Sequence, residues 1–121
     1  MTRRVLIVED EPNIADALRF LLTREGFDVS VESDGAKALD RLQAVAADLV
    51  ILDVMLPNRS GFDILRDLRS GGLSAPPVLM LTAKGQAQDR QTAEALGVTA
   101  FMTKPFSNAE VIETVRDLAG A

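Results

Sequence analysis

The sequence predicts an α/β domain with a mostly parallel sheet and helices on both of its faces. Five strand-like apolar runs alternate with five helix-like segments, and short turns join them. No linker, low-complexity tract or short-period repeat interrupts the series. Strands that alternate with helices form parallel sheets, because each helix carries the chain back across a face of the sheet. The 121 residues can bury one core, so we expect residues 1–121 to form a single domain.

The first half of the chain contains three predicted strands. Residues 4–8 are continuously apolar, and residues 27–32 alternate, which is typical of a shorter strand near a sheet edge. Residues 48–53 form an apolar run between turn signals and indicate a central strand buried on both faces. Two helices lie between these strands, the first ended by Gly26. Their inward positions are Ile14, Ala17, Leu18, Leu21 and Leu22, then Ala38, Leu39, Leu42 and Val45.

The second half contains two more strands, residues 78–81 and 99–103, and three helices. Ser70-Gly71-Gly72 ends the first of these helices. The next helix, residues 87–95, has few large apolar residues, so we expect it to be held loosely. The last helix is predicted to begin with Ser107 or Asn108 as its cap. The inward residues of the first and last of these helices are Phe62, Leu65 and Leu68, then Val111, Ile112, Val115 and Leu118.

Composition excludes several classes of chemistry. The chain has no cysteine and no histidine, which removes disulfides, thiol nucleophiles, Ser-His-Asp catalysis and His-ligated zinc. A metal must therefore have oxygen ligands, which favours a hard cation such as Mg²⁺. The net charge of −5 argues against direct nucleic-acid binding. With no membrane-length apolar run and no signal-peptide core after Met1, we expect a cytoplasmic protein without membrane insertion.

Charged and polar residues follow four of the predicted strands. Parallel strands end at one edge of the sheet, so these residues should meet there. Carboxylates about 4 Å apart repel by roughly 4 kcal/mol per pair at an effective dielectric constant near 20, and a divalent cation and a lysine would offset that repulsion. Such a cluster can hold Mg²⁺ and a phosphoryl group, and a carboxylate can act as the nucleophile. The residues are Glu9, Asp10 and Glu11, then Asp53, Thr82 and Lys104.

Each residue also has a purely structural interpretation. Asp53 could simply end its strand and start a turn. Asp10 or Glu11 could cap the following helix, with Pro12 in its first turn. The remaining structural roles are a strand end or core position for Thr82 and Phe101, and a surface position for Lys104.

Five features, in this order along essentially the whole chain, resemble the receiver domain of two-component response regulators. They are Glu9-Asp10, Asp53-Val54-Met55-Leu56-Pro57, Gly61, Thr82-Ala83 and Lys104-Pro105-Phe106. The resemblance implies a three-layer, flavodoxin-like (βα)5 fold with strand order 2-1-3-4-5. It also implies that Asp53 accepts a phosphoryl group from a phosphohistidine on a histidine kinase or phosphotransfer protein. Asp10, Asp53 and the Met55 backbone carbonyl would bind Mg²⁺, with Glu9 acting through water.

The resemblance implies further roles around the phosphate. Thr82 would hydrogen-bond a phosphoryl oxygen, and Lys104 would pair with the phosphate after a cis peptide bond to Pro105 orients it. Phe101 would turn inward as Thr82 moves, shifting the face made by the fourth helix, fifth strand and fifth helix towards a downstream protein target. Met55 and Lys84 would tune the lifetime of the phosphorylated state. We expect a switch that catalyses only its own phosphoryl transfer and dephosphorylation.

Some positions depart from the family pattern. Glu9 replaces the commoner aspartate. The stretches Arg90-Gln91-Thr92, Val98-Thr99-Ala100 and Glu113-Thr114 lack most of the charge pairs through which receivers of the winged-helix class dimerise, so we expect a monomer or weak dimer. The chain shows no effector domain, so it is either a single-domain regulator or an excised receiver.

Three other functions are alternatives to a phosphorylated receiver domain. A receiver-like interaction module that works without phosphate would not need Asp10, Asp53, Thr82 and Lys104 together. A Mg²⁺-dependent aspartyl phosphatase of the haloacid dehalogenase type would need a second aspartate at the position of Met55. A flavodoxin-type electron carrier would need flavin-stacking aromatics, and the chain has no Trp or Tyr.

Overall fold

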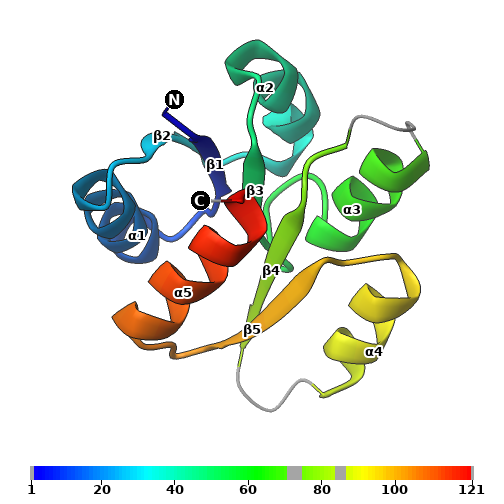
Figure 1. The fold of residues 1–121 in the computed structure, drawn as a ribbon. Helices are drawn as coiled ribbons and strands as arrows, with labels where there is room; N and C mark the ends of the chain where they lie inside the picture. The colour runs from blue at the N-terminus through cyan, green and yellow to red at the C-terminus, as the bar shows by residue number, and fades with distance from the viewer. Residues whose placement is uncertain (1, 71–74, 84–86, 121) are drawn as a thin grey trace.

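A five-stranded parallel sheet lies between two layers of helices (Figure 1). The computed structural model describes residues 2–70, 75–83 and 87–120. The strand order is β2-β1-β3-β4-β5, which confirms the predicted flavodoxin-like fold. The strands are β1 (Arg4–Val8), β2 (Asp28–Glu32), β3 (Leu49–Asp53), β4 (Val78–Ala83) and β5 (Ala100–Lys104). The helices are α1 (Pro12–Arg24), the short 3-10 helix η1 (Gly35–Lys37), α2 (Ala38–Val45), α3 (Gly61–Ser70), α4 (Ala87–Ala95) and α5 (Asn108–Ala119).

The sheet separates two hydrophobic cores. Successive residues of β3 point to opposite faces, and all five are buried, as expected for a central strand covered on both sides. Leu49 and Ile51 pack with α1 and α5, whereas Val50 and Leu52 pack with α2, α3 and α4. Each face of the sheet therefore has its own core. Among the described residues, no helix combines the length and apolar content required to cross a membrane.

The helix ends explain part of the polar sequence. Ser107 caps α5: its hydroxyl accepts the Glu110 amide, and the Glu110 carboxylate accepts the Ser107 amide, which together form a capping box. α1 begins at Pro12, but the side chain of Glu11 at the cap position accepts no capping hydrogen bond. Helix capping therefore does not explain the acids after β1. Gly71 and Gly72, the predicted stop signal of the third helix, lie outside the described residues.

Two strands extend beyond their apolar runs. β4 continues through Thr82 and Ala83, and β5 includes Lys104, because Thr82 pairs with Thr103 and Ala83 with Lys104 in the parallel ladder. Thr82 and Lys104 therefore belong to strands and are fixed by backbone hydrogen bonds. In contrast, α4 is loosely packed as predicted, since of its nine residues Ala93 is the one that is buried.

Candidate functional site

Three carboxylates meet at the carboxyl edge of the sheet. Glu9 directly follows β1, and Asp53 is the last residue of β3, so adjacent parallel strands bring them to the same place. Glu9, Asp10 and Asp53 each offer a carboxylate oxygen, and these atoms lie within 4.8 Å of one another. Glu9 and Asp53 are 1% and 5% exposed, whereas Asp10 is exposed. The cluster is therefore buried at its base and open to solvent at one side.

Lys104 pairs with both buried acids. Its Nζ atom donates to Glu9 Oε2 and to Asp53 Oδ2, each at 3.1 Å. Burial by itself would lower the pKa of Lys104, but the hydrogen bonds to Asp53 and Glu9 raise the pKa above its usual value. The ammonium group is therefore held in its charged form beside Asp53. The Lys104–Pro105 peptide bond that follows is cis.

The ionised form of Glu9 is destabilised by its surroundings in the cluster. Burial raises the pKa of its carboxyl group from 4.5 to about 7, and the negative charge of Asp53 adds to the rise. The Glu11 amide, which donates to Glu9 Oε1 at 3.1 Å, opposes the shift by stabilising the charged form. A positive charge in addition to that of Lys104 would offset the remaining free-energy cost of keeping Glu9 ionised.

The donor set fits a hard divalent cation. All three candidate ligands are carboxylate oxygens, which are the ligands that Mg²⁺ prefers. Exposed Asp10 leaves a solvent side where such an ion can keep bound water. Met55, whose backbone carbonyl we expect to complete the set, lies on the loop just after β3, and its side chain is exposed. Its role remains a prediction. Lys84 lies outside the described residues.

The loop after β3 is held close to Asp53. A Cβ atom on Gly61 would overlap the carbonyl oxygen of Asp53, so only glycine allows this approach. The Gly61 amide donates to the Val54 carbonyl at 2.9 Å. From the neighbouring loop, Asp34 accepts a hydrogen bond from Asn58 Nδ2 at 3.0 Å, and this bond helps to lower the pKa of Asp34. These contacts restrain the segment that carries Met55.

Thr82 and Phe101 contact α4 rather than the acidic cluster. Thr82 is 3% exposed, and its hydroxyl donates to Asp89 Oδ2 at 2.9 Å. Phe101 is half-buried, and the Arg90 guanidinium lies 5.9 Å from the centre of its ring. Asp89 was not among the residues predicted to form the site. An acid in the first turn of a helix is common for electrostatic reasons, so its sequence position carried no distinct signal.

Comparisons with known proteins identify the family of this chain. The sequence model of the family described as "Response regulator receiver domain" matches residues 5–116. The chain is 45% identical over 112 residues to the sensory transduction protein RegX3 of Mycobacterium tuberculosis. That match covers 93% of this chain and 48% of the relative, so the chain spans about half the length of the curated relatives it matches.

Two solved structures show the same fold. The BeF3-activated N-terminal receiver domain of Klebsiella pneumoniae RstA superposes with a TM-score of 0.91 at 26% identity, over 98% of this chain and all of that chain. A response regulator receiver protein from Burkholderia phymatum superposes with a TM-score of 0.84 at 36% identity, over 98% of this chain and 96% of that chain.

Proposed function

The chain belongs to the family of response regulator receiver domains of two-component systems, and from this premise we propose that Asp53 is its phosphoacceptor. One observation carries the proposal. Asp53 is a buried carboxylate at the end of β3, paired with Lys104 and clustered with Glu9 and Asp10. No other part of the described chain combines a buried strand-end carboxylate with a lysine and further acids.

The proposed reaction is a phosphoryl transfer to Asp53. A carboxylate oxygen of Asp53 attacks the phosphorus of a phosphohistidine on the donor protein. A phosphorus–oxygen bond forms, the phosphorus–nitrogen bond breaks, and the electron pair of the broken bond returns to the departing imidazole. Lys104 compensates the negative charge that accumulates next to Asp53.

The acids around Asp53 support a metal site as part of the proposal. We propose that Glu9, Asp10, Asp53 and the Met55 carbonyl hold Mg²⁺, with Glu9 acting through water. When bound, the ion would neutralise charge on the carboxylates and on the transferred phosphoryl group. Without it, the carboxylates and the phosphate would repel one another in a site of reduced dielectric constant.

We propose a histidine kinase or a histidine phosphotransfer protein as the phosphoryl donor, and the face formed by α4, β5 and α5 as the output surface. A new phosphoryl group adds charge and acceptor oxygens close to Thr82 and Lys104, and these contacts would shift the loosely packed α4. The domain would act as a monomer or weak dimer in the cytoplasm, and would catalyse only its own phosphorylation and dephosphorylation.

Intact mass spectrometry tests the proposal. The protein is incubated with acetyl phosphate, with Mg²⁺ or with a chelator, beside Asp53→Ala. The matched control is Asp63→Ala, which removes an acid from the first turn of α3. We expect one added phosphoryl group in the wild type and in Asp63→Ala, only with Mg²⁺, and none in Asp53→Ala. A folded Asp53→Ala protein that still gains the group would reject the assignment. No gain in any variant would favour a phosphate-independent interaction module.

A further inference from the structure

The resting contact of Thr82 involves a residue to which neither the family resemblance nor the proposed function assigns a role. The Thr82 hydroxyl donates to Asp89 Oδ2, on the first turn of α4, at 2.9 Å. Thr82 is buried and fixed in the β4–β5 ladder, while Asp89 is half-buried on a helix with one buried residue. The bond therefore joins a rigid strand to a loosely packed helix.

The hydroxyl of Thr82 has a single proton to donate. The Asp89 carboxylate and the oxygens of an ionised phosphoryl group are both acceptors, so each needs that proton. Thr82 cannot donate to both at once. We propose that Asp89 is a positioning residue for Thr82: it engages the hydroxyl in the unphosphorylated protein and competes with the phosphoryl group on Asp53 for it. This inference rests on the proposed phosphorylation of Asp53.

Through this competition, phosphorylation of Asp53 would change how α4 is held against β4. Once Thr82 turns to a phosphoryl oxygen, α4 loses a charge-assisted hydrogen bond in its first turn, and few apolar contacts remain to hold it. The adjacent residue, Arg90, lies over the ring of Phe101. The same helical turn thus contacts both residues expected to switch, and release of Asp89 would also free the position of Phe101.

Removal of the competitor should strengthen binding of a phosphoryl mimic. Beryllium fluoride with Mg²⁺ serves as the probe, and its dissociation constant is measured by calorimetry. We expect Asp89→Ala to bind it roughly three- to tenfold more tightly than the wild type, the range expected for loss of one competing charge-assisted hydrogen bond. Asp89→Asn removes the charge but keeps an acceptor oxygen, so it should fall between the wild type and Asp89→Ala.

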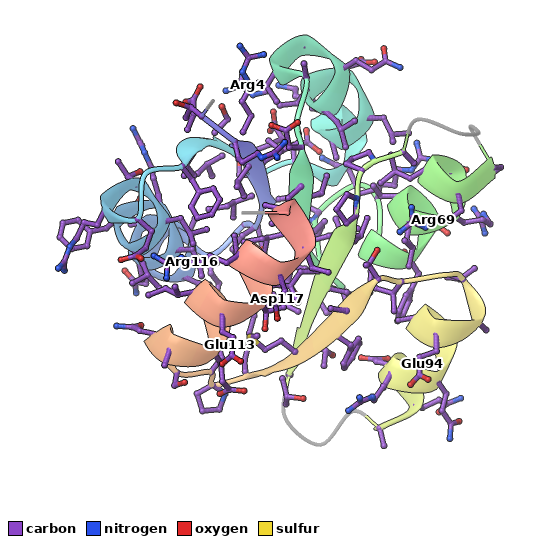
Figure 2. All side chains as sticks on the ribbon, in the orientation of Figure 1. Arg4, Arg69, Glu94, Glu113, Arg116 and Asp117 are labelled. Carbon is purple, nitrogen blue, oxygen red and sulfur yellow. The ribbon has the colours of Figure 1, made fainter. Side chains whose placement is uncertain are left out.

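Two further variants separate the hydrogen bond from general electrostatics. Glu94→Ala removes one acid from the same helix, on which Glu94 is labelled in Figure 2. Glu94 is exposed and pairs with Arg90, so the Glu94→Ala protein should bind beryllium fluoride with the affinity of the wild type. In a Thr82→Ala background, Asp89→Ala should cause no further change. Equal effects of Asp89→Asn and Asp89→Ala, or an effect that persists without the Thr82 hydroxyl, would assign the gain to charge alone and overturn the proposal.

Amide hydrogen exchange of α4 gives a second readout that needs no bound anion. Both Asp89→Ala and Thr82→Ala should speed exchange at residues 87–95 relative to Glu94→Ala, because each removes one end of the same bond. Unchanged exchange in Thr82→Ala would overturn the role of Asp89 while leaving the proposed function intact. A wild-type protein that binds no beryllium fluoride in the presence of Mg²⁺ would instead overturn the proposed function, and the competition with it.

Discussion

At the scale of the residue, Glu9 combines a structural cost with a proposed functional gain. Its carboxyl group is buried beside Asp53, which raises its pKa to about 7, and Lys104 compensates only part of the charge. Replacement by an apolar residue would remove this cost, but also one of the three oxygen donors that lie within 4.8 Å of one another. The residue would therefore favour the proposed cation at the expense of stability in the metal-free protein.

The raised pKa of Glu9 predicts that, in the presence of a chelator, the free energy of unfolding depends on pH. Unfolded Glu9 releases its proton near pH 4.5, whereas the folded protein keeps it up to about pH 7. The contribution of Glu9 is therefore fully present below pH 4.5 and is lost as pH rises through 7, with a decrease on the order of 3 kcal/mol. Urea denaturation at several pH values should show this decrease in the wild type and not in Glu9→Gln. Glu11→Gln, at an exposed position, should follow the wild type, and parallel curves for wild type and Glu9→Gln would contradict the prediction.

A second residue-level prediction concerns the close approach of Gly61 to Asp53. A methyl group there would overlap the Asp53 carbonyl, so Gly61→Ala should lower the free energy of unfolding by about 3 kcal/mol. Any folded fraction should also accept phosphate poorly, since the overlap displaces Asp53. Gly26→Ala is the comparison, because Gly26 has φ of +94° but open space around it. It should cost about 1–2 kcal/mol from backbone strain alone, with normal phosphorylation. Equal phosphorylation of both variants would argue against the close approach at Gly61.

At the scale of the element, α4 and α5 are held differently. α5 begins with a capping box and buries Val111, Val115 and Ala119, whereas α4 buries Ala93 alone among its nine residues. Arg69 holds the segment that follows α4: its guanidinium donates to Gly97 O at 2.8 Å and to Thr99 Oγ1 at 2.9 Å. Polar contacts therefore restrain the first turn of α4, through Asp89, and the turn after the helix, through Gly97, whereas the helix itself buries only Ala93. This arrangement suits an element that moves.

The capping box of α5 predicts that loss of the Ser107 hydroxyl lowers the stability of the protein. Ser107→Ala should lower the free energy of unfolding by about 1 kcal/mol, because the Glu110 amide loses its acceptor. Thermal or urea denaturation would measure the change. Ser70→Ala is the control: it also removes an exposed serine from a helix terminus, but its hydroxyl donates back to the Arg66 carbonyl within α3, so the effect should be smaller. A larger loss in Ser70→Ala would contradict the prediction.

At the scale of the whole molecule, the hydrophobic cores and the proposed phosphorylation site occupy different parts of the fold. Two hydrophobic cores lie on opposite faces of the sheet, whereas the acids and Lys104 lie at one edge. Substitutions of Asp10 or Asp53 should therefore leave the fold intact, and a cation bound at the edge should stabilise the whole domain, because unfolding would release it.

Addition of Mg²⁺ should raise the free energy of unfolding of the wild type. The expected gain is about 2.7 kcal/mol at one hundred times the dissociation constant, and scanning calorimetry with Mg²⁺ or chelator measures it as a rise in Tm. Asp10→Ala should lose this dependence. Asp16→Ala, which removes an exposed acid from the outer side of α1, should retain it. A Tm shift of equal size in both variants would show that the ion binds elsewhere.

The element order, the buried central strand and the polar residues at the strand ends could all be predicted from the amino-acid sequence. These features are local: hydrophobic periodicity, turn residues and strand ends can be read within a few positions. Parallel topology then requires the carboxyl ends of adjacent strands to meet, so the association of Glu9, Asp10, Asp53 and Lys104 could also be predicted. The exact strand order needed the family resemblance.

Which individual side chains pair with one another becomes apparent only in the folded protein. The pairing of Thr82 with Asp89 depends on how a loosely packed helix settles against β4, and the contact of Asn58 with Asp34 depends on the approach of two loops. The ends of β4 and β5 likewise followed from the register of their ladder rather than from their own apolar runs. Such contacts arise from the balance of packing and hydrogen bonding across the fold, and residue type and spacing do not encode that balance locally.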